Sequence, residues 1–328
     1  MKYDFVAIGD ITTDAFIRLK DAEVHCDINH EKCEICMRFG DKIPFEDVFV
    51  VRAVGNSPNA SVAAARLGLK SALVSNLGDD QNGKECIESL KKDRVDTKFV
   101  EVHKGRKTNY HYVLWFHEER TILIKHEQYD YKLPDIGEPG WVYLSSLGEN
   151  SLEFHKVIAE YLNNHPSIKL VFQPGTFQIK LGFEPLKSIY QRSDLFFCNK
   201  EESQRILKTQ EADIKKLLER MHKLGPKTIV ITDGIRGAYA FDGKEAWSMR
   251  AYPDPKPPFE RTGAGDSFSS TFAVALAQGK DLKEALRWGP VNAMSVVQKV
   301  GAQAGLLSKE ELEKYLKEAP SDYYPQKM

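Results

Sequence analysis

Hydrophobic residues in this chain fall into short runs, and most of the runs are separated by stretches with helical periodicity. The first run, residues 5–8, ends in Gly9 and Asp10, which is typical of a buried strand that delivers a loop to a sheet edge. From residue 140 onward, apolar runs alternate with amphipathic helical patterns. This alternation predicts an α/β fold with a mostly parallel sheet and helices on both faces. The later runs are residues 141–144, 170–172, 195–197 and 229–231.

Two segments depart from this rhythm. Residues 21–52 are charged and irregular up to an apolar run at their end, and residues 108–124 fit two strands around a polar turn. We expect both to form a small β-sheet lid over the substrate site. The predicted organisation is an α/β core of residues 1–20, 53–104 and 126–328 and a discontinuous lid of residues 21–52 and 105–125.

Charge and hydropathy exclude several functions. The 328 residues include 46 Lys and Arg and 47 Asp and Glu, with no basic tail, so nucleic-acid binding by bulk electrostatics is not expected. No apolar stretch approaches the roughly 18 residues of a membrane-spanning helix, and the chain begins without a signal-peptide core. We expect a cytoplasmic protein that binds neither nucleic acid nor membrane and keeps its five cysteines reduced.

The most informative motif runs from Gly263 to Asp266. Two glycines one residue apart let the backbone approach a ligand closely, and residues 267–278 have helical periodicity. We expect the free amides that open this helix to form an anion hole at Gly263, Ala264 and Gly265. Asp266 beside them is placed to take a proton from a substrate hydroxyl. The alternative is an ordinary helix start, where Asp is common.

Other turns carry candidate ligands. Gly55 permits close backbone approach, and the amide of Asn59 can read a substrate hydroxyl as donor and acceptor together. Asn199 and Glu202 follow an apolar strand and suit Mg²⁺ held through its waters, or else a capping box at a helix start. The glycine-bearing turn 232–237 either lines a nucleotide or leads into a hairpin.

In this order the pieces resemble the ribokinase-like family of carbohydrate kinases, also called the PfkB family, over nearly the whole chain. The strongest element is Thr262-Gly263-Ala264-Gly265-Asp266. The resemblance implies a three-layer α/β/α sandwich, ATP and Mg²⁺ as cofactors, and Asp266 as the catalytic base. It also implies that Asn199 and Glu202 organise Mg²⁺, that Asp10, Asp14, Gly55 and Asn59 contact the sugar, and that Thr232, Gly234, Gly237 and Asn292 contact ATP.

Two departures from the family pattern change what it implies. Glu260, Arg261 and Thr262 stand where the family often has Asp-Thr-Thr, and the first and third of these positions help to hold a monovalent cation in some members. Potassium dependence is therefore left open, and we hypothesise that the fixed charge of Arg261 replaces the cation. The first sugar loop has Val54 before Gly55 where two glycines are usual.

The lid segment also carries a cysteine cluster. Cys26, His30, Cys33 and Cys36 have spacings that a four-ligand zinc site can use. The alternative is that these thiols only pack within a polar segment.

Together these features predict an ATP-dependent kinase that phosphorylates a hydroxymethyl group of a sugar. A nucleoside kinase of the same fold is an alternative, because Tyr110, Tyr112, Trp115 and Phe116 make the lid strands aromatic. A catalytically idle sugar-sensing protein is another. The lid strands could pair edge to edge in a homodimer, and the oligomeric state is left open. Arg106, Lys107 and Arg120 could contact a phosphorylated sugar, but we interpret them as exposed hairpin charges.

Overall fold

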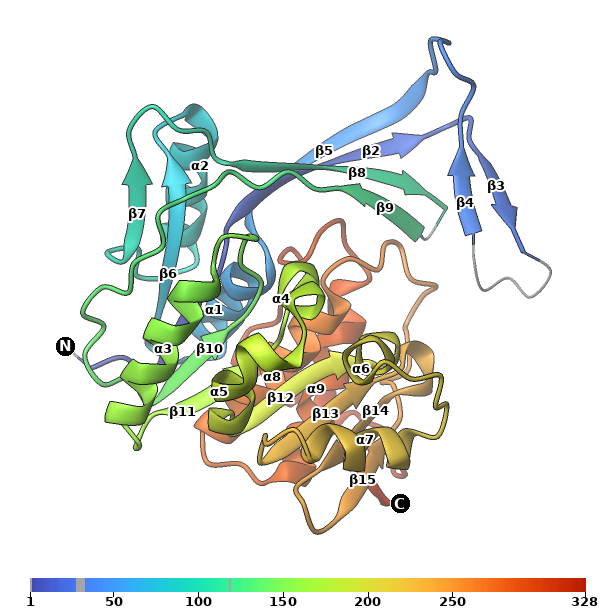
Figure 1. Ribbon diagram of the computed structural model, residues 1–328. Coiled ribbons are helices and arrows are strands. Elements are labelled where there is room, and N and C mark those ends of the chain that lie inside the picture. Colours follow the sequence, from blue (N-terminus) through green and yellow to red (C-terminus); the bar gives the residue numbers. More distant parts are fainter. Residues whose placement is uncertain (1, 28–32, 118) are drawn as a thin grey trace.

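The computed structural model describes residues 2–27, 33–117 and 119–328, and a ten-stranded sheet forms its centre (Figure 1). Seven neighbouring strands of this sheet run parallel, and three antiparallel strands extend one edge. In spatial order the strands are β7 (Val100–His103), β6 (Ser71–Gly78), β1 (Phe5–Ile8), β10 (Trp141–Leu144), β11 (Lys169–Phe172), β12 (Leu195–Asn199), β13 (Thr228–Thr232), β14 (Ala238–Phe241), β15 (Ala246–Met249) and β16 (Gln326–Lys327).

Helices cover both faces of this sheet, which confirms the predicted three-layer α/β/α sandwich. Strand β1 shows the reason, because Phe5 and Ala7 point into one core and Val6 and Ile8 into the other. One layer holds α1 (Asn56–Arg66), α2 (Gln81–Lys92), α8 (Ala264–Ala277), α9 (Leu282–Val296) and α10 (Lys309–Lys317). The other holds α3 (Leu152–Asn164), α4 (Thr176–Leu181), α5 (Phe183–Arg192), α6 (Lys200–Leu207) and α7 (Ile214–His222).

A separate four-stranded sheet, here the small sheet, projects from this body (Figure 1). Its order is β5 (Phe45–Val54), β2 (Thr12–Leu19), β8 (Asn109–Phe116) and β9 (Glu119–Leu123). Strand β2 pairs with both β5 and β8. The organisation predicted from the sequence had instead assigned residues 12–19 to the α/β core. The chain therefore leaves the central sheet and enters the small sheet around Asp10.

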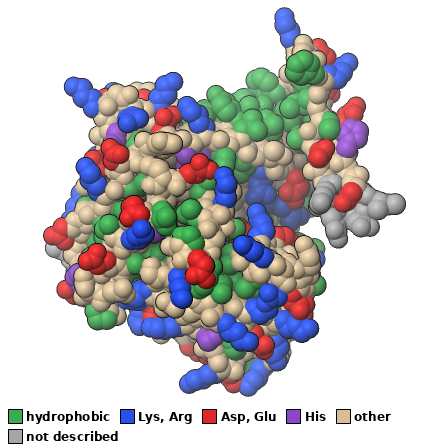
Figure 2. Space-filling model, viewed as in Figure 1, with side chains coloured by type: hydrophobic (Ala, Val, Ile, Leu, Met, Phe, Trp, Pro, Cys, Tyr) green, Lys and Arg blue, Asp and Glu red, His purple; other side chains and the backbone are tan. Residues whose placement is uncertain are grey.

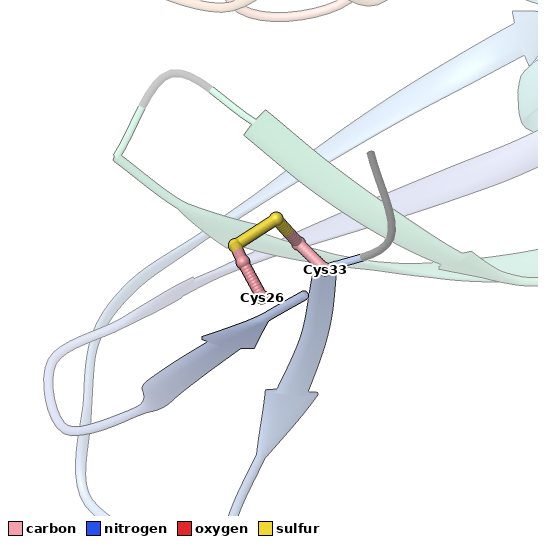
Figure 3. The surroundings of a disulfide bond; sticks show 2 residues. All are labelled: Cys26 and Cys33. Carbon is pink, nitrogen blue, oxygen red and sulfur yellow. A yellow bond between two sulfur atoms is a disulfide. The ribbon is translucent and has the colours of Figure 1, made fainter. Parts of the chain in front are cut away.

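A hairpin of β3 (Glu23–Cys26) and β4 (Cys33–Cys36) carries the cysteine cluster (Figure 3). Cys26 and Cys33 lie opposite each other and form a disulfide, so the expectation of reduced thiols is wrong for this pair. Two of the four proposed zinc ligands are thus bonded to each other, and His30 lies outside the described residues. Among the residues that are described, no group of three or more His, Cys, Asp and Glu side chains is arranged to hold a metal.

We expect this disulfide to leave three free thiols, those of Cys36, Cys86 and Cys198. Protein unfolded directly into iodoacetamide should carry three labels, and five after reduction, with Cys26 and Cys33 labelled only after reduction. Five labels before reduction, or stoichiometric zinc in the purified protein, would contradict the disulfide and restore the metal hypothesis.

Candidate active site

The predicted phosphate-binding turn stands at the start of α8. Gly263 has a φ of 83°, and a Cβ there would lie 2.3 Å from the Cβ of Ala302. A Cβ on Gly265 would meet nothing within 4 Å. The amides of Gly265 and Asp266 belong to the first helical turn, whose N–H groups have no intrahelical acceptor. The turn is therefore packed against protein at Gly263 and open at Gly265, which suits an anion.

Three side-chain amides hold the carboxylate of Asp266. Asn56 Nδ2 donates to Oδ1 at 3.0 Å, Asn59 Nδ2 to Oδ2 at 2.8 Å, and Gln173 Nε2 to Oδ1 at 3.1 Å. Burial raises the pKa of Asp266 above its ordinary value, while the hydrogen bonds from Asn59 and Gln173 act in the opposite direction. These amides therefore orient an enclosed carboxylate and help to keep it ionised.

Sequence reasoning missed Asn56 and Gln173. Gln173 directly follows β11, and its Oε1 accepts hydrogen bonds from the hydroxyls of Tyr143 and Ser269. These bonds fix which end of the Gln173 amide faces Asp266. The sequence did contain a signal for Gln173. It is a polar residue before Pro-Gly at the carboxyl end of a buried strand, and parallel sheets bind ligands at that end of their strands.

Gly55 and Asn59 lie beside the turn from Gly263 to Asp266. Asn59 donates to Asp266, and its Oδ1 accepts from Gln303 Nε2 at 2.9 Å, so both ends of its amide are engaged within the protein. Gly55 has a φ of 121°, and a Cβ there would lie 2.7 Å from the carbonyl oxygen of Asp10. Only glycine allows this close approach of the two loops. Sugar contacts by both residues stay a prediction.

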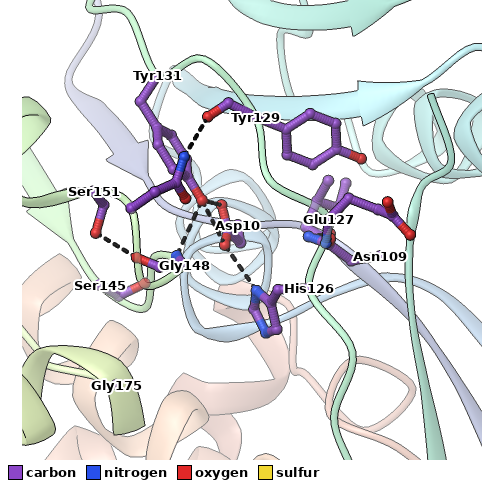
Figure 4. A network of polar contacts seen from close by, with 12 residues as sticks. Asp10, Asn109, His126, Glu127, Tyr129, Tyr131, Ser145, Gly148, Ser151 and Gly175 are labelled. Carbon is purple, nitrogen blue, oxygen red and sulfur yellow. Dashed lines mark hydrogen bonds and ion pairs between the residues drawn. The ribbon is translucent and has the colours of Figure 1, made fainter. Parts of the chain in front are cut away.

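Asp10 and Asp14 each face a histidine, and Figure 4 shows the pair of Asp10 and His126. Asp10 accepts from the Tyr131 hydroxyl at 2.9 and 3.0 Å, and its Oδ2 lies 2.9 Å from Nδ1 of His126. Asp14 Oδ1 lies 3.3 Å from Nδ1 of His111 and makes no hydrogen bond among the described residues. Asp10 is thus engaged within the protein, whereas Asp14 keeps capacity for a ligand.

Asn199 and Glu202 form the capping box that was their structural alternative. Glu202 N donates to Asn199 Oδ1 at 2.7 Å, and Asn199 N donates to Glu202 Oε2 at 2.8 Å. Burial raises the pKa of Glu202, and the negative charge of Asp266 adds to this. A divalent cation would relieve the repulsion between two such carboxylates, so the residues fit Mg²⁺. The magnesium role itself stays a prediction.

The proposed nucleotide turn follows β13, which ends at Thr232. A short 3₁₀ turn, η1 (Gly234–Arg236), leads to Gly237, which has a φ of 100°. A Cβ at Gly237 would lie 2.1 Å from the carbonyl oxygen of Met249, but one at Gly234 would meet nothing within 4 Å. The turn thus has an open side at Gly234.

Asn292 has a structural place in the described molecule. It is fully buried in α9, where its Nδ2 donates to Thr271 Oγ1 at 2.7 Å and its Oδ1 accepts from Leu307 N at 3.0 Å. Its amide therefore joins α8 to the segment after α9. A contact with adenine stays a prediction.

Arg120, and not Arg261, is the cation beside Glu260. The fully buried Glu260 accepts from the amide of Thr262 at 2.6 Å, and Arg120 Nε lies 3.9 Å from its Oε1. Arg261 instead pairs with Glu119 at 3.6 Å. Arg120 is 29 % exposed and comes from the small sheet, so its interpretation as an exposed hairpin charge is wrong. Figure 2 shows Lys and Arg side chains in the hollow between this sheet and the body.

Buried polar atoms without a hydrogen bond concentrate at this site. Among the described residues, five of the eight such side-chain atoms belong to the Gly263–Asp266 turn and its surroundings or to the pair of Asp14 and His111. Unsatisfied buried polar atoms are uncommon in folded proteins and point to a missing ligand or water. The five are Asp14 Oδ1, His111 Nε2, Arg120 Nε, Arg261 Nε and Thr262 Oγ1.

A three-layer sandwich with a helix-start anion site, an adjacent carboxylate and a small sheet beside it defines a class of phosphate-transferring enzymes. The family model described as pfkB family carbohydrate kinase matches residues 22–309, and the chain belongs to this family. It is accordingly a phosphotransferase with an alcohol group as acceptor.

Individual relatives agree with this membership. The chain is 29 % identical to a ribokinase of Bacillus subtilis over 80 % of its own length and 87 % of the relative's. It is 26 % identical to a 5-dehydro-2-deoxygluconokinase of Halalkalibacterium halodurans over 82 % of its own length and 87 % of the relative's. The structure of Arabidopsis thaliana ribokinase complexed with ribose and ATP superimposes with a TM-score of 0.79 at 21 % identity, covering 97 % and 99 % of the chains.

Within the described ranges, none of the helices is both long and apolar enough to span a bilayer.

The raised pKa of Asp266 predicts the acid limb of the pH profile. A base must be ionised, so kcat/KM should fall about tenfold per pH unit below the pKa of Asp266, which lies above that of a free aspartate. Gln173→Leu removes a hydrogen bond that lowers this pKa and should move the limb to higher pH. The exposed Gln191→Leu is the control, and an unmoved limb in Gln173→Leu would assign the limb to another group.

Proposed function

We propose that this protein is an ATP-dependent kinase that phosphorylates a hydroxymethyl group of a sugar, with Asp266 as the general base. The observation that carries the proposal is the carboxylate of Asp266, oriented by three amides at the N-terminus of α8 beside the open Gly265. A proton acceptor and an anion site are thus adjacent, as in-line phosphoryl transfer requires.

In the proposed reaction, Asp266 accepts the proton of the acceptor hydroxyl as its oxygen bonds to the γ-phosphorus of ATP. The bond from that phosphorus to the β–γ bridging oxygen breaks, and ADP leaves. The amides of the Gly263–Gly265 turn stabilise charge on the transferring group. Thr232, Gly234 and Gly237 are proposed to line the nucleotide.

Asn199 and Glu202 are the residues that would hold Mg²⁺, through its waters. When bound, Mg²⁺ neutralises charge on the phosphates. The fit rests on the raised pKa of Glu202, because the nearby charge of Asp266 makes a cation favourable there.

We propose that Arg120, and not Arg261, supplies the fixed positive charge that replaces a monovalent cation beside Glu260. It approaches Glu260 from the small sheet, and its positive charge also lowers the pKa of Asp266. The small sheet would then act as the lid, because it brings this charge to the catalytic turn. A monovalent cation would not be needed beside Glu260.

The aromatic lid residues do not favour a nucleoside acceptor. Tyr110 and Tyr112 contact each other on the face of β8 opposite to His111. Trp115 is buried against Phe49 and Phe259. Nucleosides are therefore included in the assay below as an alternative class of acceptor.

A cytoplasmic location remains a prediction, and cell fractionation would check it.

We expect acceptor-dependent ADP release from MgATP when free sugars, sugar phosphates and nucleosides are offered in turn. Asp266→Asn should lower this rate by about 10²-fold or more, because it removes the base. The exposed Asp21→Asn serves as the matched control.

The same assay is run in potassium and in choline chloride. A large activation by potassium would contradict the role given to Arg120. Equal rates for Asp266→Asn and the parent protein would contradict the mechanism, and no turnover with any acceptor would favour the sugar-sensing alternative.

We also propose a homodimer through the outer face of the small sheet. Val50, Ala15, Tyr112 and Leu123 form a row across all four strands, and Val50, Tyr112 and Leu123 are 42 %, 50 % and 51 % exposed. Figure 2 shows hydrophobic side chains gathered over this sheet. Such a face is stabilised by burial against a second copy.

Val50→Asp should shift the protein from dimer to monomer in sedimentation velocity, because a charge would be buried at the interface. Val102→Asp changes a still more exposed valine, on β7, and should leave the dimer intact. A monomeric parent protein would refute this interface.

A further inference from the structure

Three consecutive residues after α9 lie against the turn at the start of α8 or close to it. Gly301 N donates to Glu260 Oε2 at 3.4 Å, and a Cβ added at Gly263 would lie 2.3 Å from the Cβ of Ala302. Gln303 follows these two residues and is only 6 % exposed. The segment therefore packs closely against the turn, and its third side chain is enclosed.

The amide of Gln303 joins two acceptors from different parts of the fold. Its Nε2 donates to the carbonyl oxygen of Ala53 at 2.7 Å and to Asn59 Oδ1 at 2.9 Å. Ala53 lies near the end of β5 in the small sheet, and Asn59 lies in the first turn of α1. An amide NH₂ group has two hydrogens, so it can serve both acceptors at once.

Gln303 decides which end of the Asn59 amide faces Asp266. An NH₂ group can only donate, so the contact with Gln303 requires the oxygen of the Asn59 amide on that side. The nitrogen of Asn59 is then the end that faces Asp266, where it donates to Oδ2 at 2.8 Å. With the amide reversed, its oxygen would face the carboxylate and the hydrogen bond would be lost. Gln303 thus acts on Asp266 through Asn59.

Ala53 marks the point where the chain leaves the small sheet for the core. It is fully buried and has a φ of 56°, a left-handed conformation that is uncommon for a residue with a Cβ. Such a conformation persists only where its surroundings hold it. Ala53 N donates to Cys86 Sγ at 3.3 Å, and its carbonyl oxygen accepts from Gln303. One amide therefore secures both this junction and the side chain of Asn59.

The main chain at Gln303 is also held in place. Arg66 Nη1 donates to the carbonyl oxygens of Gln303 at 2.7 Å and Leu306 at 2.9 Å, and Arg66 Nε donates to Asp93 Oδ1 at 2.6 Å. Arg66 ends α1, the helix that also carries Asn59. Gln303 is thus tied to the same helix through its main chain and through its side chain.

We propose that Gln303 is a positioning residue that holds Asn59 against Asp266 and joins this contact to the end of β5 in the small sheet. The inference rests on the proposed kinase function, in which Asp266 is the base, and deepens it. The orientation of the base then depends on a residue that is two hydrogen bonds away from it.

The test uses Gln303→Met, which keeps the length of the side chain and removes both donors. Gln278→Met is the matched control, because Gln278 Nε2 also donates to a main-chain carbonyl, that of Leu67 at 2.7 Å, but from the far end of α8. The pKa of Asp266 is followed by NMR of its carboxyl carbon in protein with isotope-labelled aspartate. The signal is assigned by its absence in Asp266→Asn. The acid limb of kcat/KM is the second measurement.

Gln303→Met should raise the pKa of Asp266 and move the acid limb to higher pH, because the hydrogen bond from Asn59 that lowers this pKa is weakened. Above the limb, kcat should fall about tenfold with KM for ATP unchanged. Gln278→Met should lower the melting temperature as Gln303→Met does but leave the pKa and the limb unmoved. Gln303→Leu, which also lacks the donors, should shift the pKa in the same direction as Gln303→Met.

A double-mutant cycle tests whether the effect passes through Asn59. In the Asn59→Leu protein, Gln303→Met should move the pKa of Asp266 no further. A further shift in that background would overturn the inference and leave the kinase intact. So would a parent-like pKa of Asp266 in both Gln303 variants.

Failure of the proposed function has a different signature. Turnover of Asp266→Asn at the parent rate, or no turnover with any acceptor, would count against the kinase mechanism. The NMR comparison needs no turnover, so it would still decide whether Gln303 positions Asn59 against Asp266.

Discussion

The site depends on holding one enclosed carboxylate ionised at the start of a helix. Asp266 loses solvation there, and three amides from two distant segments replace part of what water supplied. Asn56 and Asn59 come from the start of α1, and Gln173 comes from the end of β11. Helix α1, strand β11 and helix α8 must therefore be packed together before the three amides can hold the carboxylate of Asp266.

A second set of charges crosses from the small sheet to the core. Asp14 raises the pKa of Asp266 and Arg120 lowers it, and both residues belong to strands of the small sheet. The position of that sheet thus sets part of the electrostatic field at the base. Arg120 also faces the buried Glu260 at the catalytic turn, so any movement of the small sheet changes the environment of both carboxylates.

Several residues serve the fold and the site together. Asn199 and Glu202 cap α6, and the negative charge of Asp266 also raises the pKa of Glu202. A capping box therefore does not exclude a role with a cation. Gly263 and Gly55 allow backbone contacts that a side chain would block, and both lie close to Asp266. The same local chemistry that starts a helix therefore also builds an anion site.

The sequence by itself determined the α/β sandwich and the helix-start turn from Gly263 to Asp266, because strand periodicity and helix-start chemistry are local. Gly263 to Asp266 was recognisable for this reason. Only the tertiary structure decided that Asn56 and Gln173 clamp Asp266, that Asp10 orients His126, and that Arg120 faces Glu260. It also placed β2 in the small sheet and joined Cys26 to Cys33. These contacts join segments through strand pairing and layer packing, which no local pattern in the chain encodes.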